Sequence, residues 1–309
     1  MPRVSAPVYA LNGGEVGEEA LSRLDLERMQ FASAVSLNIL PRVVGSMTLR
    51  PGLEHVADIN LGEVRLIEYS FSGSSASMLV PILSDKEMRI LKDNAFVSRV
   101  AVATAITNGD FSSFTGWTNA SASGASASVS GGNLVLSGAT QGRAAARQTV
   151  TIAADDQGKE HGLRLEVVRG PVWVHIGSSL GGSDVLRLSV LDDGDHSLAF
   201  TPTTGSIYLE LYTDKPRQAL VARCEIDAPG TLVLSTPWET ADLPAPRHKQ
   251  NIDVVYVASR QLQQREIQHR GDTSWGIQRY KVDDGPFVTA DGSVALTPSV
   301  YTGNGTLTA

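Results

Sequence analysis

The residues best placed for nucleophilic chemistry are 177–181, Gly-Ser-Ser-Leu-Gly, which match the spacing G-x-S-x-G. In hydrolases this motif holds a serine on a sharp turn between a strand and a helix. Here Val185 to Leu191 follows, and its apolar and polar side chains alternate as they do in a strand. The sequence therefore favours a hairpin loop around Ser179, and we expect no enzymatic activity.

Two acidic turns could supply oxygen ligands to Ca²⁺. They are Asp155-Asp156 and Asp192-Asp193-Gly194-Asp195. Neither has the twelve-residue pattern of an EF-hand loop, so solvated turns are the competing interpretation. The six histidines include no i,i+4 pair of the kind that binds zinc on a helix. A structural calcium ion is therefore the one cofactor that the sequence leaves open.

Four aromatic side chains could stack against sugar rings. Trp173 and His175 alternate with Val174 in a predicted strand, and Tyr208 and Tyr212 alternate with leucines in another. This alternation places Trp173, His175, Tyr208 and Tyr212 on the outer face of a sheet, where aromatic rings bind the C–H faces of sugars. Packing under a loop or at a subunit contact is the alternative.

Composition limits the class of protein. A chain of 309 residues fits two or three domains, and its formal net charge of −7 argues against a broad surface that grips nucleic acid. The basic run Arg260, Arg265, His269 and Arg270 is typical of a solvated edge, although it could touch phosphate. No apolar run is long enough to span a membrane, and no secretory signal pattern opens the chain.

The single cysteine, Cys224, excludes an internal disulfide and a multi-thiolate metal site. It lies in a predicted strand, where alternation places Leu220, Ala222, Cys224 and Ile226 on one face. We therefore expect a buried, unreactive thiol.

One long helix is predicted, from Gly17 to Leu37, because apolar residues recur there at spacings of three and four. Arg23, Asp25 and Arg28 lie on it and are candidates for subunit or adaptor contacts. An intrahelical ion pair between Asp25 and Arg28 is the alternative, since their spacing is i,i+3.

Residues 105–232 read as a series of half-buried strands separated by glycine, proline and aspartate turns. The inward positions are expected to be Leu134, Leu136, Leu163, Leu165, Val167, Val172, Val174, Ile176, Leu186, Leu188, Val190, Ile207, Leu209 and Leu211. Many strands without a helix predict a β-sandwich, most simply a jelly roll.

Two family resemblances follow from ordered motifs. Residues 12–15 (Asn-Gly-Gly-Glu), 23–28 (Arg-Leu-Asp-Leu-Glu-Arg), 38–41 (Asn-Ile-Leu-Pro) and 49–52 (Leu-Arg-Pro-Gly) resemble the opening of phage tail nozzle proteins, the tail tubular protein B type of short-tailed bacteriophages. Residues 236–238 (Thr-Pro-Trp), 242–244 (Asp-Leu-Pro) and 285–287 (Gly-Pro-Phe) continue this resemblance. Residues 108–111 (Asn-Gly-Asp-Phe) with Gly116-Trp117 resemble the start of carbohydrate-binding-module-like jelly rolls.

The resemblances imply a mainly β protein in three parts. Residues 1–104 would be an N-terminal helix with platform strands, 105–232 an inserted jelly-roll β-sandwich, and 233–309 a return to the platform. That platform would be propeller-like, and its last segment is expected to be truncated relative to the family. Resemblance to the carbohydrate-binding modules also suggests Asp110 and Asp227 as calcium ligands.

The function implied is that of a structural virion protein in the phage tail, assembled in the host cytoplasm. It would form a homo-oligomeric ring, expected to be a hexamer, next to adaptor and portal-proximal proteins and in reach of tail fibres. Genomic DNA would pass through the ring without specific binding. The alternative is a phage structural or attachment protein whose jelly roll binds a host-surface glycan.

Overall fold

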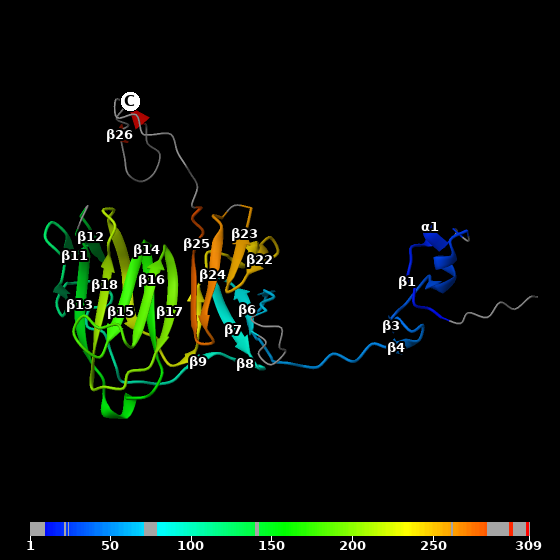
Figure 1. Cartoon of the computed structure of the whole chain (residues 1–309), viewed down its shortest axis with the longest axis horizontal. Helices are drawn as coiled ribbons and strands as arrows, with labels where there is room; N and C mark the ends of the chain where they lie inside the picture. Colours follow the sequence, from blue (N-terminus) through cyan, green and yellow to red (C-terminus); the bar gives the residue numbers. More distant parts are fainter. Residues whose placement is uncertain are drawn as a thin grey trace, which may run out of the picture. The chain divides into compact units, whose positions relative to one another are not determined.

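A computed structural model describes residues 10–21, 23, 25–70, 79–139, 142–260, 262–282, 297–298 and 307–308. The chain is mainly β and divides into two compact units, Met1–Asp58 and Ile59–Ala309 (Figure 1). The residues beyond 282 that are described form one short strand pair, β26 (Thr297–Pro298) with β27 (Leu307–Thr308).

The N-terminal unit contains short elements. Strand β1 (Gly14–Glu15) pairs in parallel with β2 (Ala32–Ser33), and β3 (Ile39–Pro41) pairs antiparallel with β4 (Met47–Leu49). Between β1 and β2 lie helix α1 (Glu18–Leu21) and a 3-10 helix (Glu27–Phe31).

The predicted long helix from Gly17 to Leu37 is wrong. Amphipathic helices of this length owe most of their stability to packing of the apolar face. No side chain of residues 10–58 that the structure describes is buried, so the apolar stripe has no core to cover. The chain instead turns and pairs Ala32–Ser33 with β1.

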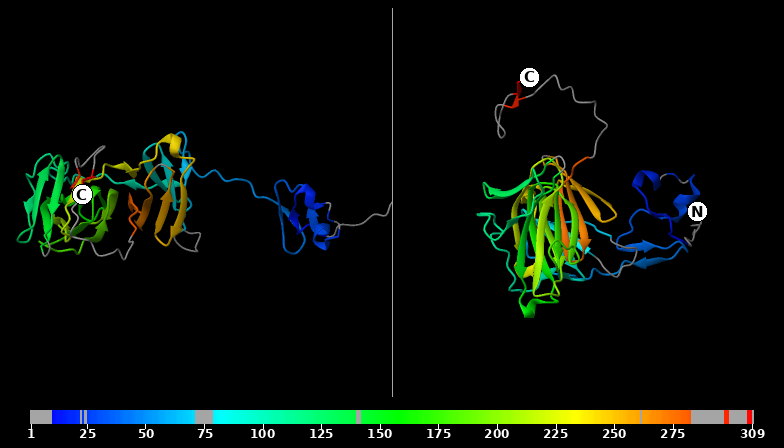
Figure 2. Two further views of the ribbon diagram at one scale, coloured as in Figure 1. Left: turned by 90° about the horizontal axis from the view of Figure 1, so that it is seen from above. Right: turned by 60° about the vertical axis from the view of Figure 1, so that its left-hand side comes forward.

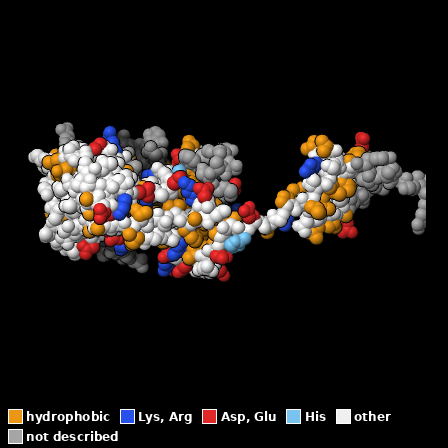
Figure 3. Space-filling view, turned by 90° about the horizontal axis from the view of Figure 1, so that it is seen from below, with side chains coloured by type: hydrophobic (Ala, Val, Ile, Leu, Met, Phe, Trp, Pro, Cys, Tyr) orange, Lys and Arg blue, Asp and Glu red, His pale blue; other side chains and the backbone are white. Residues whose placement is uncertain are grey.

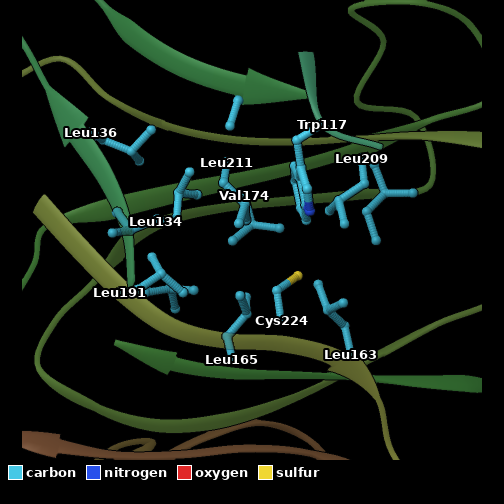
Figure 4. Packing of buried hydrophobic residues seen from close by; sticks show 14 of the residues in the cluster. Trp117, Leu134, Leu136, Leu163, Leu165, Val174, Leu191, Leu209, Leu211 and Cys224 are labelled. Carbon is cyan, nitrogen blue, oxygen red and sulfur yellow. The ribbon is translucent and has the colours of Figure 1, made fainter. Parts of the chain in front are cut away.

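The second unit contains a two-layer β-sandwich. One layer has the strand order β10-β13-β18-β15-β16, and the other has the order β11-β12-β19-β14-β17 (Figure 1). The strands are β10 (Thr118–Asn119), β11 (Ser126–Ser130), β12 (Asn133–Ser137), β13 (Ala144–Thr151), β14 (His161–Arg169), β15 (Val172–Gly177), β16 (Leu186–Leu191), β17 (Gly194–Phe200), β18 (Ser206–Thr213) and β19 (Ala219–Ile226). A 3-10 turn, Ala154–Asp156, links β13 to β14. The core between the layers contains Trp117, Leu134, Leu165, Leu209 and Leu211 (Figure 4).

A second core is formed by residues that precede the sandwich in the sequence together with residues that follow it. It lies between the strand set β5-β6-β7-β21, with β8 beside β7, and the set β25-β24-β23-β22 (Figure 2). These strands are β5 (Arg65–Leu66), β6 (Leu79–Ser84), β7 (Glu87–Lys92), β8 (Ala95–Phe96), β21 (Val233–Ser235), β22 (Arg247–Asn251), β23 (Val254–Ala258), β24 (Arg265–Gly271) and β25 (Ser274–Arg279). Leu79 and Met88 thus pack in one core with Trp238 and Trp275. Strand β9 (Ser98–Arg99) pairs with β20 (Gly230–Thr231), and the 3-10 turn Thr240–Asp242 precedes β22.

One nine-stranded sheet serves both cores, because β17 pairs with β25. Arg164 on β14 lies opposite Ser197, and Ser197 lies opposite Trp275. Residues that are directly opposite share a face of the sheet. Trp275 belongs to the second core, whereas Leu163 and Leu165 on the other face belong to the first. The sheet therefore covers one core with each of its faces.

β-bulges in β19 and β16 change which side chains are buried, so two of the predicted strand faces are wrong in part. Arg223 pairs with Glu166 and Val221 with Val167, so Ala222 is an extra residue in β19. As a result Val221 and Cys224 are buried, while Leu220 and Ala222 are only half-buried. In β16 a register shift, with a φ of 63° at Val190, leaves Val190 47% exposed and buries Leu191 in its place.

Mainly β architecture with a β-sandwich is therefore confirmed. The finer assignments, a jelly roll and a propeller-like platform, stay predictions, as do the domain boundaries after residues 104 and 232. No helix of the described segments could span a membrane, and the longest has five residues.

Candidate binding face

The outer side of the sheet β10-β13-β18-β15-β16 gathers aromatic and charged side chains. Val174, Leu209 and Leu211 point into the first core (Figure 4). Their neighbours along β15 and β18 therefore point away from it, because successive side chains of a strand alternate. We call this surface the aromatic face, and its residues are Arg143, Arg147, Trp173, His175, Arg187, Tyr208, Glu210 and Tyr212.

Three of the four predicted aromatic residues are in contact. Trp173 lies opposite Tyr212 across β15 and β18, and their rings stack with centroids 5.8 Å apart and planes 19° apart. The His175 ring lies 4.9 Å from the Tyr212 ring, and its Nε2 is 3.2 Å from the Tyr212 hydroxyl. Tyr208 lies on the same face, opposite Gly177 and Thr149. All four side chains are half-buried.

A buried carboxylate organises the charges under these rings. The Glu210 side chain is 4% exposed and forms ion pairs with Arg143, at 2.8 Å, and with Arg147. The Arg143 guanidinium carbon also lies 4.5 Å from the centre of the Tyr212 ring, a cation–π contact. Two guanidinium groups thus compensate the Glu210 charge, and one of them fixes Tyr212 in place.

The arginines were missed at the sequence level. Their signal is weak, since Arg143 and Arg147 interrupt a run of alanines, and only pairing of β13 with β18 brings Arg147 opposite Glu210. Arg187 joins them through β16, where it lies opposite His175.

Burial sets the protonation states of the face. Desolvation lowers the pKa of His175 below its ordinary value, and Arg187 and Arg143 act in the same direction against Glu210. Desolvation also raises the pKa of Tyr212. At neutral pH the face therefore carries a neutral imidazole and a neutral phenol, both able to donate and accept hydrogen bonds.

The two calcium candidates take different roles. The exposed Asp110 carboxylate accepts hydrogen bonds from the Ser112 amide and hydroxyl. Asp227 accepts from Arg99 Nε at 3.1 Å and lies 3.7 Å from Arg164. Two guanidinium groups beside Asp227 oppose a bound cation. Among the described residues, no group of three or more His, Cys, Asp or Glu is arranged to hold a metal ion.

Asp227 belongs to a partly buried ion network of Arg99, Glu160, Arg164, Asp195, Ser197 and Asp227. The Arg99 side chain is 2% exposed and donates to Glu160 at 3.0 Å, to Ser197 Oγ at 2.6 Å and to the Thr273 carbonyl at 2.6 Å. Arg164 pairs with Asp195, which also accepts from the Ser235 amide. Sequence patterns give no sign of this network, because its six members come from four separate segments of the chain.

The acidic turns serve local structure. Asp156 accepts from the Ala103 amide and from Lys159, while Asp193 accepts from the Gly170 amide and pairs with Lys281. Ser179 lies in the loop between antiparallel β15 and β16, so the strand–turn–helix context of a hydrolase serine does not form there. Cys224 is buried, as predicted, and burial raises the pKa of its thiol.

Of the proposed contact residues in the N-terminal unit, Arg23 and Asp25 pair with each other. Their two hydrogen bonds, at 2.8 and 2.7 Å, are solvent-exposed. This ion pair raises the pKa of Arg23 and lowers that of Asp25. The side chain of Arg28 lies outside the described residues, so the Asp25–Arg28 pairing stays a prediction.

Comparison with known proteins gives no relative to set beside this geometry. No family model matches the chain, and no curated protein matches it.

Proposed function

We propose that this chain is a structural virion protein, a component of a phage tail nozzle that works through its contacts with other copies and neighbours rather than through catalysis. One observation carries the proposal. Among the residues of the N-terminal unit that the structure describes, ten large hydrophobic side chains are exposed and no side chain is buried. Figure 3 shows part of this hydrophobic surface. The ten are Leu26, Val35, Leu37, Leu40, Val43, Val44, Met47, Leu49, Leu53 and Val56.

Such a surface is unfavourable in water. Val43, Val44 and Leu49 are 95%, 87% and 80% exposed, and an accumulation of exposed large apolar side chains is typical of surfaces that contact other proteins. The occupant we propose is a second copy of this chain, because a ring closes when a patch on each copy binds a different surface of its neighbour. The family resemblance of residues 12–52 supports the same role, and adaptor proteins and tail fibres are the further neighbours that it implies.

The net charge of the chain fits a conduit. It is −7 at pH 7 when the histidines are neutral. A neutral or acidic lumen would let DNA slide, since attraction to many phosphates would retard it. In the proposal, the virion tail is the site of action and genomic DNA passes without specific binding.

The test is the oligomeric state of the full chain. We expect light scattering and negative-stain electron microscopy to show ring particles for the wild type. Combined Val43→Ser, Val44→Ser and Leu49→Ser should leave monomers with unchanged thermal unfolding of the second unit. Leu180→Ser, at a residue 66% exposed in the second unit, is the matched control and should keep the rings. A wild type that stays monomeric at its highest soluble concentration would contradict the proposal.

A second candidate function is recognition of a host-surface glycan by the aromatic face. The stacked pair Trp173–Tyr212 favours it, because partly exposed aromatic rings on a sheet are suited to sugar C–H faces. The full chain should then bind a glycan array, and Trp173→Ala should abolish the signal while preserving the fold. Binding by the wild type that survives Trp173→Ala would exclude this surface as the site.

A further inference from the structure

The aromatic face carries more positive than negative charge. It contains three guanidinium groups, from Arg143, Arg147 and Arg187, and one carboxylate, from Glu210. Asp214 at its margin lies 3.9 Å from Lys215, which offsets it. This local excess of positive charge stands out in a chain whose net charge is −7.

Arg187 is the cation that is available to a ligand. Arg143 and Arg147 both form ion pairs with the carboxylate of Glu210, whose side chain is 4% exposed. Arg187 is exposed and forms no hydrogen bond or ion pair with any residue that the structure describes. It lies directly opposite His175 in the pairing of β15 with β16, on the same face as Trp173.

Arg187 lies on the same face of the sheet as Trp173, whose ring could stack against a ligand. Trp173 is half-buried and lies against Tyr212, so part of its ring stays open to solvent. On β15 the side chains of Trp173 and His175 are two residues apart and therefore neighbours on one face. Trp173 and Arg187 are thus diagonal neighbours on adjacent strands, a relation that puts residues about 7–8 Å apart and within reach of long side chains.

We propose that the aromatic face binds an acidic oligosaccharide, with the sugar ring on Trp173 and its carboxylate on Arg187. The inference rests on the second candidate function and names its ligand class. Arginine suits a carboxylate because two of its N–H groups can donate in parallel. Arg187 is then the residue that selects acidic over neutral sugars, while Arg143, Arg147 and Glu210 hold Tyr212 under the site.

Nucleic acid is the competing anionic ligand with stackable rings. The face offers one uncommitted arginine, whereas single-stranded nucleic acid binding uses a charged groove that follows many phosphates. The acidity of residues 105–232 also repels a polyanion. These charges favour a short acidic glycan.

The experiment uses the full chain and an array of bacterial surface polysaccharides. Each polysaccharide is printed twice, once untreated and once after carbodiimide and borohydride reduction of its carboxylates to alcohols. We expect binding to carboxylate-bearing glycans and loss of about tenfold or more in affinity after reduction, as for a lost charge-assisted hydrogen bond. Single-stranded DNA is included as a separate arm.

The variants assign the effect to residues. Arg187→Gln should weaken binding to untreated acidic glycans by about tenfold and leave binding to their reduced forms unchanged. Arg169→Gln is the matched control, because Arg169 is exposed on the other layer of the sandwich and should change neither. Trp173→Phe, which keeps an aromatic ring, should retain binding, whereas Trp173→Ala should remove it.

The outcomes separate this inference from the function on which it rests. Equal binding to untreated and reduced glycans, or no effect of Arg187→Gln, would overturn the acidic-ligand inference and leave glycan recognition standing. Absence of binding to every glycan would overturn both. Binding to DNA alone, with the same dependence on Trp173 and Arg187, would also overturn both.

Discussion

Arg99 Nε donates to Asp227 Oδ2 at 3.1 Å, and this contact joins the chain just before the first sandwich to the chain just after its last strand. The Arg99 side chain is 2% exposed and that of Asp227 is 11% exposed. Arg99 also reaches the Thr273 carbonyl in the turn between β24 and β25. One guanidinium therefore ties both cores of the second unit together.

Arg99→Met should destabilise the second unit by about 3–5 kcal/mol, because it leaves the Asp227 side chain, which is only 11% exposed, without its main cation. Urea unfolding followed by tryptophan fluorescence measures the change. Adding Asp227→Asn should recover part of the loss, since the uncompensated charge is then gone. Arg169→Met, at an exposed arginine without a partner among the described residues, should cost less than about 0.5 kcal/mol. Equal effects of the two single variants would contradict a structural role for the network.

The free energy of unfolding of the second unit should decrease as the pH falls, because His196 titrates differently in the folded and the unfolded chain. Desolvation and Arg270 lower the pKa of this fully buried imidazole to about 3, from an ordinary 6.5. Below pH 6.5 the unfolded chain binds a proton that the folded chain does not, so unfolding becomes easier as the pH falls towards 3. The slope from this one group should approach about 1.4 kcal/mol per pH unit.

Urea unfolding across about pH 7 to pH 4 checks this slope. His196→Gln removes the titrating group and should flatten the pH dependence by about one proton, whatever its cost at neutral pH. His175 and His269, whose pKa values are also lowered, add to the slope in both proteins. An unchanged slope in the variant would show that His196 is not the group responsible.

Ile252→Asn should stabilise the hairpin of β22 and β23. Ile252 has a φ of 52° and is 80% exposed, so a β-branched residue occupies a left-handed conformation without burying its side chain. Asparagine tolerates this conformation, and the gain should be about 1 kcal/mol. Gln250 Nε2 donates to the main-chain carbonyl of Ile252, and that bond survives the substitution. Ile252→Val, which stays β-branched, is the control and should give no rise in melting temperature.

Gly109→Ala should prevent stable folding of the first sandwich. A Cβ at this position would lie 1.9 Å from the Cys224 carbonyl oxygen, and the Cys224 amide donates to the Gly109 carbonyl at 2.7 Å. We expect a loss above about 4 kcal/mol, seen as low soluble yield or a large drop in melting temperature. Gly17→Ala, where an added Cβ would meet no atom within 4 Å, should change stability by less than about 0.5 kcal/mol.

The alternation of inward and outward side chains along the sequence was enough to predict most of the strands. Leu163, Leu165 and Val167, and likewise Ile207, Leu209 and Leu211, are buried as their alternation predicts. The same alternation placed Trp173, His175, Tyr208 and Tyr212 on the outer face. Period-two patterning needs no knowledge of the partner strand, which is why these residues could be read from the sequence.

Tertiary structure decided the features that depend on which strands pair with each other. The bulges at Ala222 and Val190 arise from pairing with β14 and β15, so the alternation alone assigned the wrong side chains to the core there. Residues 17–37 carry a helical pattern, yet a helix of that length needs a core to cover, and no side chain that the structure describes in this segment is buried. Arg147 reaches Glu210 on the aromatic face, and Arg99 reaches Asp227, through pairings between distant segments. The sequence therefore supplied the aromatic residues of the candidate site, and the fold supplied its charges.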